Sequence, residues 1–182
     1  MKLHLLRHPR PAVDHGLCYG ASDVPADAAA LDQVLAALLE AGLPGSLPVY
    51  TSPLRRCRDL ASALTPAALH VDARLAEMDF GAWEMRSWSE IPRTDVDAWN
   101  ADLLHYRPGG AENVMDVARR VAAFRAALLA AEATEALVIC HAGTIRLLLA
   151  MRPGLSLEQA ALDAASTPHR IGYGELQVLD IR

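Results

Sequence analysis

The chain has 182 residues, of which 52% are apolar and 21% are charged. This length fits one globular domain, residues 1–182, because domains usually contain about 100–200 residues. The composition excludes disordered, collagen-like and coiled-coil proteins. With 17 basic and 22 acidic residues, the formal net charge is -5, which argues against a nucleic-acid partner, since such proteins usually carry a basic excess.

The cysteines and the first residues indicate the compartment. Cys18, Cys57 and Cys140 are odd in number and form no C-x-x-C pair, so we expect neither a disulfide framework nor a structural zinc site. The apolar run that ends at Arg7 and His8 is too short for a signal peptide or a membrane span. We therefore predict a soluble, cytoplasmic protein without a membrane partner.

Apolar runs of strand length alternate with helical stretches, as in layered α/β proteins. Proline and glycine mark the loops between them. In chain order we predict strand 2–7, a helix capped by Asp27 that ends near residue 41, strand 48–51, helix 53–64 with Ser52 as N-cap and Pro53 at its first position, a short strand at 69–71, small helices within 88–105, helix 113–133, strand 136–140, helix 142–151 and a final strand at 172–181.

Three of the predicted strands end in side chains suited to an anion. Arg7 and His8 close the first strand, and His141 follows the strand that ends at residue 140. Arg55 lies in the first turn of the helix after strand 48–51, where free N–H groups also favour negative charge. Because ligands of open α/β sheets bind at the carboxyl ends of the strands, we expect these side chains to share one site.

These residue types point to phosphoryl chemistry. The guanidinium groups of Arg7 and Arg55 match the geometry of phosphate oxygens. A neutral imidazole, here that of His8, is a competent nucleophile, and a covalent intermediate divides one difficult displacement into two easier ones. A protonated His141 would offset charge in the transition state. Taken alone, however, a histidine at a strand end is more often structural than catalytic.

Further candidates are less specific. Glu77, Asp79 and Glu84 lie in one short acidic segment, and the residues alone do not decide which of them would donate a proton. The hydroxyl groups of Ser22 and Thr144 are candidates for binding phosphate, although turn and helix-cap roles are equally plausible.

Several motifs of phosphate chemistry are absent from the sequence. It contains no G-x-x-x-x-G-K-[ST] loop, and no G-x-G-x-x-G follows the first strand. The first strand also does not end in the paired aspartates of magnesium-dependent phosphatases. Metal-free histidine chemistry is the interpretation that remains.

Four motifs occur in a characteristic order: Leu6-Arg7-His8, Ser52-Pro53-Leu54-Arg55, Glu77-Met78-Asp79-Phe80-Gly81-Ala82-Trp83-Glu84 and Cys140-His141-Ala142-Gly143. In order and spacing they resemble the histidine phosphatase superfamily over nearly the whole chain. Within that superfamily, the Tyr19-Gly20-x-x-Asp23 loop and the Asp-Phe-Gly-x-Trp-Glu segment are most similar to the α-ribazole phosphatases of cobalamin synthesis.

The resemblance implies a phosphoglycerate-mutase-like fold with three α/β/α layers, in which a mixed central sheet carries helices on both faces. It implies that His8 is the phosphorylated nucleophile and that Glu77 donates the proton to the leaving oxygen. Arg7, Arg55 and His141 would bind and stabilise the phosphoryl group. No metal or organic cofactor is implied.

The expected activity is hydrolysis of a small phosphorylated substrate, with α-ribazole 5'-phosphate as the preferred one. The alternatives are a phosphatase of different or broad specificity, a phosphoglycerate mutase-like enzyme and a non-catalytic protein that binds a phosphate ligand. A mutase must keep its intermediate away from water, and this short chain offers little lid sequence. The presence of both histidines and Glu77 argues against the non-catalytic alternative.

Three positions depart from the pattern of the superfamily. Pro9 and Arg10 follow the first histidine, where glycine, often with Glu or Gln next, is usual. Pro9 lacks a backbone N–H and stiffens the turn, and we favour a solvent-facing Arg10 over a contact with phosphate. Met85 occupies a position where similar sequences commonly have glycine.

Overall fold

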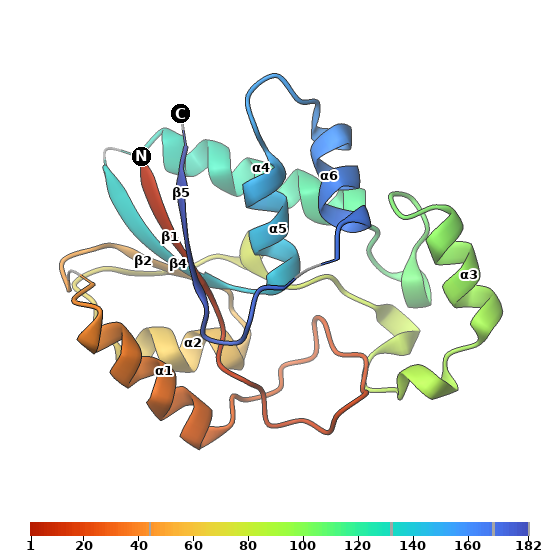
Figure 1. The fold of residues 1–182 in the computed structure, drawn as a ribbon, viewed down its shortest axis with the longest axis horizontal. Coiled ribbons are helices and arrows are strands. Elements are labelled where there is room, and N and C mark those ends of the chain that lie inside the picture. The colour runs from red at the N-terminus through yellow and green to blue at the C-terminus, as the bar shows by residue number, and fades with distance from the viewer. Residues whose placement is uncertain (44, 132, 169, 182) are drawn as a thin grey trace.

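The computed structural model describes residues 1–43, 45–131, 133–168 and 170–181. Within these residues, five strands form one mixed sheet in the order β3-β2-β4-β1-β5 (Figure 1). The strands are β1 (Lys2–Arg7), β2 (Val49–Thr51), β3 (Leu69–Val71), β4 (Glu135–Cys140) and β5 (Leu176–Asp180). The four strands from β3 to β1 are parallel, and β5 pairs with β1 in the antiparallel direction.

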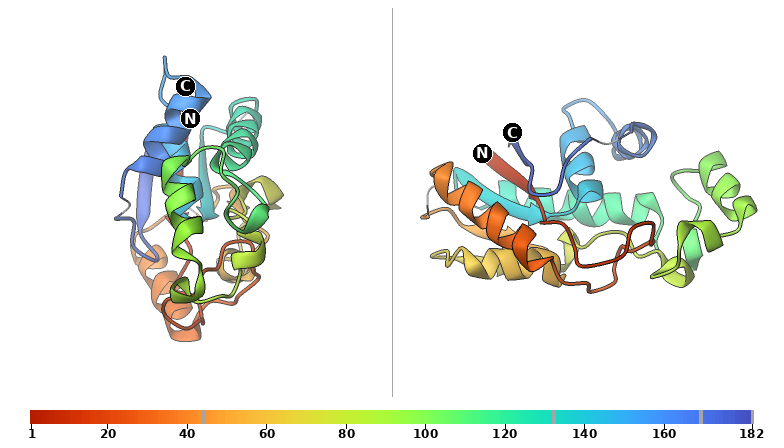
Figure 2. Two further views of the ribbon diagram at one scale, coloured as in Figure 1. Left: turned by 90° about the vertical axis from the view of Figure 1, so that its right-hand side faces the viewer. Right: turned by 60° about the horizontal axis from the view of Figure 1, so that its bottom comes forward.

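Helices cover both faces of the sheet, as two views of the ribbon show (Figure 2). The α-helices are α1 (Ala28–Glu40), α2 (Arg55–Ala63), α3 (Arg93–Ala101), α4 (Val114–Leu129), α5 (Ala142–Ala150) and α6 (Leu157–Ser166). Short 3-10 turns are η1 (Ala73–Leu75), η2 (Gly81–Trp83), η3 (Trp88–Glu90) and η4 (Pro108–Gly110). Among the described residues, no helix has both the length and the apolar character needed to cross a bilayer.

The alternation of side chains along β4 explains the layers. Val138 and Cys140 are fully buried in a core formed with α4 and α5, whereas Leu137 and Ile139 belong to a second core formed with α1 and α2. Successive residues of a strand point to opposite faces, and a strand buried on both faces is apolar throughout. The predicted α/β/α architecture with a mixed sheet is therefore confirmed.

Most predicted elements form, but some boundaries were wrong. The helix predicted at 53–64 begins at Arg55, because Leu54 is still extended and is the N-cap in place of Ser52. The final strand begins at Leu176, after a turn in which Gly174 has a φ of 71°. The helix predicted to reach residue 133 already ends at Leu129.

Helix α6 (Leu157–Ser166) is absent from the elements predicted from the sequence. Ser156 and Gln159 form a capping box at its start, in which each side chain accepts a hydrogen bond from the other residue's backbone N–H. A serine followed three residues later by glutamine is a recognised signal for a helix start. This helix was therefore detectable from the sequence.

Candidate active site

Two histidines meet where the adjacent strands β1 and β4 end. The register places Arg7 opposite Cys140, so that His8 and His141 follow at the same edge of the sheet. Their ring centroids are 5.1 Å apart, and their planes are inclined by 59°. Both are buried, with exposed fractions of 3% for His8 and 0% for His141. We call this pair the histidine centre.

The surroundings of His8 leave one ring nitrogen free to react. Its Nδ1 lies 2.7 Å from the carbonyl oxygen of Pro9, and because a carbonyl only accepts, Nδ1 carries the hydrogen. Burial, followed by the positive charge of Arg56, lowers the pKa of His8 to about 3. The imidazole is therefore neutral at pH 7, with a lone pair on Nε2.

His141 lies at the N-cap position of α5 and is enclosed by polar and sulfur atoms. Its Nε2 is 2.8 Å from the Oγ of Ser52 and 3.6 Å from the Sγ of Cys57. Burial and then the charge of Arg56 hold the pKa of His141 well below its usual value. In the free protein His141 is thus neutral, and a cationic role requires nearby negative charge that raises its pKa.

The structure brings Arg56, not Arg55, to the histidine centre. The Arg55 side chain is about half exposed, and its Nε lies 3.6 Å from Asp59. Arg56 is fully buried, lines the cavity beside His8, and donates hydrogen bonds to the carbonyl oxygens of Gly20 at 2.6 Å and Ser22 at 2.8 Å. The assignment of Arg55 is corrected because successive helix residues point about 100° apart.

Arg7 reaches the same cavity from the end of β1. Its Nη1 donates to the carbonyl of Ile171 at 2.6 Å, and the guanidinium carbon lies 3.9 Å from the centre of the Tyr173 ring. The Nε atoms of Arg7 and Arg56 are both buried and make no hydrogen bond. An unpaired buried donor costs about 1–3 kcal/mol, so both arginines retain capacity for an anionic acceptor.

Glu77 lines the same cavity and contacts the start of α5. Its Oε2 accepts a hydrogen bond from the Gly143 N–H at 3.3 Å. A Cβ atom on Gly143 would lie only 2.5 Å from the Glu77 Oε1. Glycine at this position therefore allows the carboxylate to approach the helix backbone.

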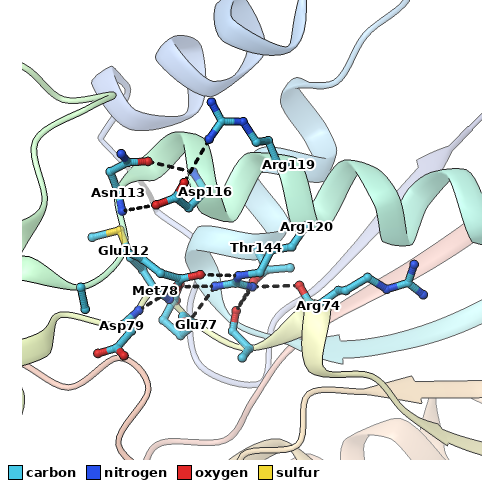
Figure 3. Close-up of polar contacts among 12 residues, drawn as sticks. Arg74, Glu77, Met78, Asp79, Glu112, Asn113, Asp116, Arg119, Arg120 and Thr144 are labelled. Carbon is cyan, nitrogen blue, oxygen red and sulfur yellow. Dashed lines mark hydrogen bonds and ion pairs between the residues drawn. The ribbon is translucent and has the colours of Figure 1, made fainter.

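Arg120 on α4 fixes the segment that carries Glu77 (Figure 3). Its guanidinium donates to the carbonyl oxygens of Arg74, Ala76 and Glu77 at distances of 2.8, 2.6 and 3.1 Å. Glu112 pairs with Arg120 at 2.9 Å. Five planar donors suit arginine to binding several backbone oxygens and a carboxylate at once.

The structure also distinguishes among the three acidic candidates. The Glu84 carboxylate accepts hydrogen bonds from the backbone N–H groups of residues 20, 21, 22 and 80 and from the Ser22 hydroxyl. Burial acts to raise the pKa of Glu84, but the bonds from Ser22 and the backbone outweigh it and lower the pKa. Asp79 accepts from the Gly81 N–H at 2.8 Å. Of the three, Glu77 alone lines the cavity.

The two predicted substrate-binding hydroxyls are engaged within the protein. Ser22 donates to Glu84, and this contact helps to shape the loop whose carbonyls bind Arg56. Thr144 is buried and lies 3.4 Å from the carbonyl oxygen of Leu75. Neither residue lines the cavity. The structure therefore assigns structural contacts to both, which corrects the expectation.

The three unusual positions have distinct surroundings. Arg10 is about half exposed and lies 3.4 Å from Asp27, and it does not line the cavity, as expected for a solvent-facing residue. Pro9 is buried and accepts the hydrogen bond from His8. Met85 has a φ of 60°, in the left-handed region that favours glycine. The chain thus keeps a glycine-like turn with a side chain that is unfavourable there.

A cavity of about 460 Å³ joins these residues to a largely apolar region. Its charged and imidazole groups come from Arg7, His8, Arg56, Glu77 and Arg146. The apolar and aromatic lining includes Leu17, Tyr19, Met78, Phe80, Trp88 and Trp99. Such a combination of a few polar groups with apolar walls is typical of small-molecule sites.

Comparison with known proteins identifies the family. The sequence model of the histidine phosphatase superfamily (branch 1) matches residues 3–169. The chain belongs to this superfamily.

Several relatives are similar over different shares of their length. A bifunctional protein of Mycobacterium tuberculosis is 36% identical over 129 residues, which are 67% of this chain and 33% of that protein. The chain thus spans about a third of the first curated relatives it matches. The adenosylcobalamin/α-ribazole phosphatase of Escherichia coli is 32% identical over 87% of this chain and 82% of its own length.

A solved structure has the same fold. The α-ribazole phosphatase of Shigella flexneri superposes with a TM-score of 0.82 at 28% identity, and the match covers 100% of this chain and 91% of that one. Together with the family match, this likeness supports the histidine phosphatase fold predicted from the motifs.

Proposed function

We propose that the protein is a cytoplasmic phosphomonoesterase that works through a phosphohistidine on His8. The observation that carries the proposal is a buried, neutral His8 with a free Nε2, placed 5.1 Å from His141 and beside Arg7 and Arg56. Membership of the histidine phosphatase superfamily supports the same chemistry.

In the first step, Nε2 of His8 attacks the phosphorus atom, and the bond from phosphorus to the leaving oxygen breaks. Glu77 gives its proton to that oxygen, so the product leaves as an alcohol. Arg7 and Arg56 bind the phosphoryl oxygens, whose negative charge favours protonation of His141. The positive groups thereby stabilise the transition state.

In the second step, water attacks phosphorus and the bond to His8 breaks. The Glu77 carboxylate left by the first step accepts the proton of the attacking water. Inorganic phosphate then leaves, and His8 returns to its neutral form. One carboxyl group thus serves both steps.

The lining of the cavity supports α-ribazole 5'-phosphate as the substrate. Only 5% of the chain is aromatic, yet Tyr19, Phe80, Trp88 and Trp99 all line this cavity. Aromatic side chains pack favourably against a flat, apolar ring system such as the base of α-ribazole. The α-ribazole phosphatases among the relatives support the same choice.

One observation favours a second candidate, a phosphorylated carboxylic acid. Arg146 lines the same cavity and is partly buried, and a guanidinium there would suit a carboxylate on the leaving group. However, its Nη2 donates to the carbonyl oxygens of Ala164 and Thr167 at the end of α6. We therefore prefer the aromatic leaving group.

The test combines turnover with detection of the intermediate. The protein should hydrolyse p-nitrophenyl phosphate without added metal, and His8→Ala should reduce kcat by at least about 10⁴-fold. Mass spectrometry after acid-free quenching of the Glu77→Gln variant should find phosphate on His8. Tight phosphate binding without turnover, or phosphorylation elsewhere, would overturn the mechanism.

A kinetic panel then tests the substrate. We expect kcat/KM to be highest for α-ribazole 5'-phosphate, compared with phosphoglycerates, sugar phosphates and nucleotides. A flat profile would indicate broad specificity, and a preference for phosphoglycerates would favour the second candidate. Mutase activity would appear as phosphate transfer between two positions of phosphoglycerate without release of phosphate.

A further inference from the structure

Two arginines of the cavity, Arg7 and Arg56, are each held by a loop in the same manner. The guanidinium of Arg7 donates to the Ile171 carbonyl and lies against the Tyr173 ring, 3.9 Å from its centre. The guanidinium of Arg56 donates to the carbonyls of Gly20 and Ser22, and its carbon lies 5.5 Å from the centre of the Tyr19 ring. In both cases, backbone oxygens bind the edge of the cation and an aromatic face covers it.

The two loops are joined to each other by their tyrosines. The hydroxyl oxygens of Tyr19 and Tyr173 are 2.8 Å apart, although the residues are separated by 154 positions. The Tyr173 ring also approaches His8, with 5.6 Å between ring centroids. This hydrogen bond therefore links the surroundings of both arginines and of His8.

Neither tyrosine is part of the sheet, so strand pairing does not fix its position. Tyr19 lies in the loop after β1, and Tyr173 precedes β5. The second loop is anchored at Gly174, whose N–H donates to the carbonyl of Arg7 at 3.1 Å. Burial and the bond to Tyr173 raise the pKa of Tyr19, so its hydroxyl keeps its proton well above neutral pH.

The position of the pair indicates what it does. Tyr173 is 43% exposed, and an exposed hydroxyl can bind water instead of a partner, so the bond contributes little to global stability. Its geometric effect is larger, because a bond between two separate loops restricts the separation of the side chains they hold. A site that binds a transition state gains from such preorganisation.

We propose that Tyr19 and Tyr173 form a clasp that holds Arg7 and Arg56 at the spacing required by a phosphoryl group in its transition state. Both are positioning residues, and the inference rests on the proposed function of the cavity. The clasp acts on the phosphoryl group, so its effect is independent of the leaving group.

The test uses Tyr19→Phe, Tyr173→Phe and the double variant, which remove the hydroxyls but keep the rings. We expect kcat/KM to fall roughly three- to tenfold in each single variant. The double variant should resemble the singles, because all three lack the same bond. The loss should be equal for p-nitrophenyl phosphate and for an aliphatic phosphate, and affinity for vanadate should fall more than affinity for inorganic phosphate.

Tyr50→Phe is the matched control, since Tyr50 stacks on His70 away from the cavity, and it should leave kcat/KM unchanged. Unchanged melting temperatures would exclude a general loss of structure. The clasp would be wrong if the effects of the two single variants multiplied in the double variant. It would also be wrong if the kinetics and the vanadate affinity of the variants were unchanged. If the wild-type protein proves inactive, the proposed function fails, while the affinities for vanadate and phosphate still decide the clasp.

Discussion

The two regions of the cavity are built in different ways. The phosphate region, which comprises the cavity residues Arg7, His8 and Arg56 with His141 next to His8, comes from the ends of parallel strands and the first turn of α2. The leaving-group region, which comprises Phe80, Trp88 and Trp99, comes from 3-10 turns, their flanks and α3, which lies away from the sheet (Figure 1). Strand pairing and helix α2 fix the groups proposed to attack phosphorus and bind its oxygens. Glu77 and the surface proposed for selectivity come from less regular segments.

The difference extends to polar contacts. In the phosphate region, the buried His8 and Arg56 and the partly buried Arg7 bind backbone carbonyls. In the leaving-group region, aromatic rings contact one another edge to face, with centroids 5.9 Å apart for Phe80 and Trp99. A substitution in the first region should therefore affect every substrate, whereas one in the second should affect substrates selectively.

The largest expected effect is at Arg56. Arg56→Ala should lower kcat/KM by about 10²–10³-fold for all substrates, because it removes a fixed donor to the phosphoryl group. Arg56→Lys should recover only part of this loss, since lysine lacks the planar fork. Steady-state kinetics measure both.

Arg55→Ala is the matched control, because the neighbouring Arg55 side chain is about half exposed and pairs with Asp59. It should change kcat/KM less than about twofold, consistent with the small contribution of exposed ion pairs. If the two alanine variants behaved alike, the placement of Arg56 in the phosphate region would be wrong.

Burial of neutral histidines should also make stability depend on pH. The pKa of His8 is about 3 in the folded protein, compared with about 6.5 when unfolded. Between these values the unfolded chain binds a proton that the folded chain does not, so stability falls as pH decreases from about 6.5 toward 3. Each buried neutral histidine contributes a slope of about 1.4 kcal/mol per pH unit.

Urea unfolding between about pH 6 and pH 4 measures this slope. His8→Gln should reduce the slope by about 1.4 kcal/mol per pH unit, which is the contribution of one proton. The double variant His8→Gln/His141→Gln should reduce the slope further, because burial also lowers the pKa of His141. Parallel curves for the wild type and both variants would show that the histidines are not buried in their neutral forms.

A smaller effect is expected at Arg120, which contacts the backbone of Glu77 and lies outside the cavity lining. Arg120→Met should lower kcat about tenfold, since about 1.4 kcal/mol of barrier corresponds to a factor of ten. KM should change little, because the groups that bind phosphate remain. The control is Arg119→Met, since Arg119 is exposed and pairs with Asp116. Equal effects of the two substitutions would contradict a positioning role.

The smallest effect is expected in the leaving-group region. Trp88 is 41% exposed at the cavity, and Trp88→Ala should raise KM for an aromatic substrate about two- to tenfold. KM for an aliphatic phosphate should stay constant. An equal change in KM for both substrates would contradict the proposed difference between the two regions.

The strand ends explain how much of the site was predictable. His8 and His141 follow apolar strands, and parallel pairing brings the ends of β1 and β4 together, as the general rule for α/β sheets requires. The same rule placed an arginine near the start of α2 but selected Arg55. The helix begins two residues later than predicted, and the rotation of its first turn decides which arginine faces the cavity.

Contacts between distant loops were not predictable from local patterns. Ser22 and Glu84 bind each other although they are 62 positions apart in the chain. The local spacing of apolar residues does not indicate that pairing. The contact of Tyr173 with Arg7 likewise depends on how the turn before β5 is placed. Strands and helices follow from repeated apolar spacing, whereas these contacts depend on the assembled fold.

The antiparallel strand β5 has a consequence for biosynthesis. The segment around Ile171 and Tyr173 holds Arg7. It is translated long after Arg7 and His8, because Ile171 lies 164 residues after Arg7 in the chain. Since domains generally fold as units during synthesis, Arg7 cannot gain this support until nearly the whole domain has been translated. Catalytic competence would therefore arise only with the last strand.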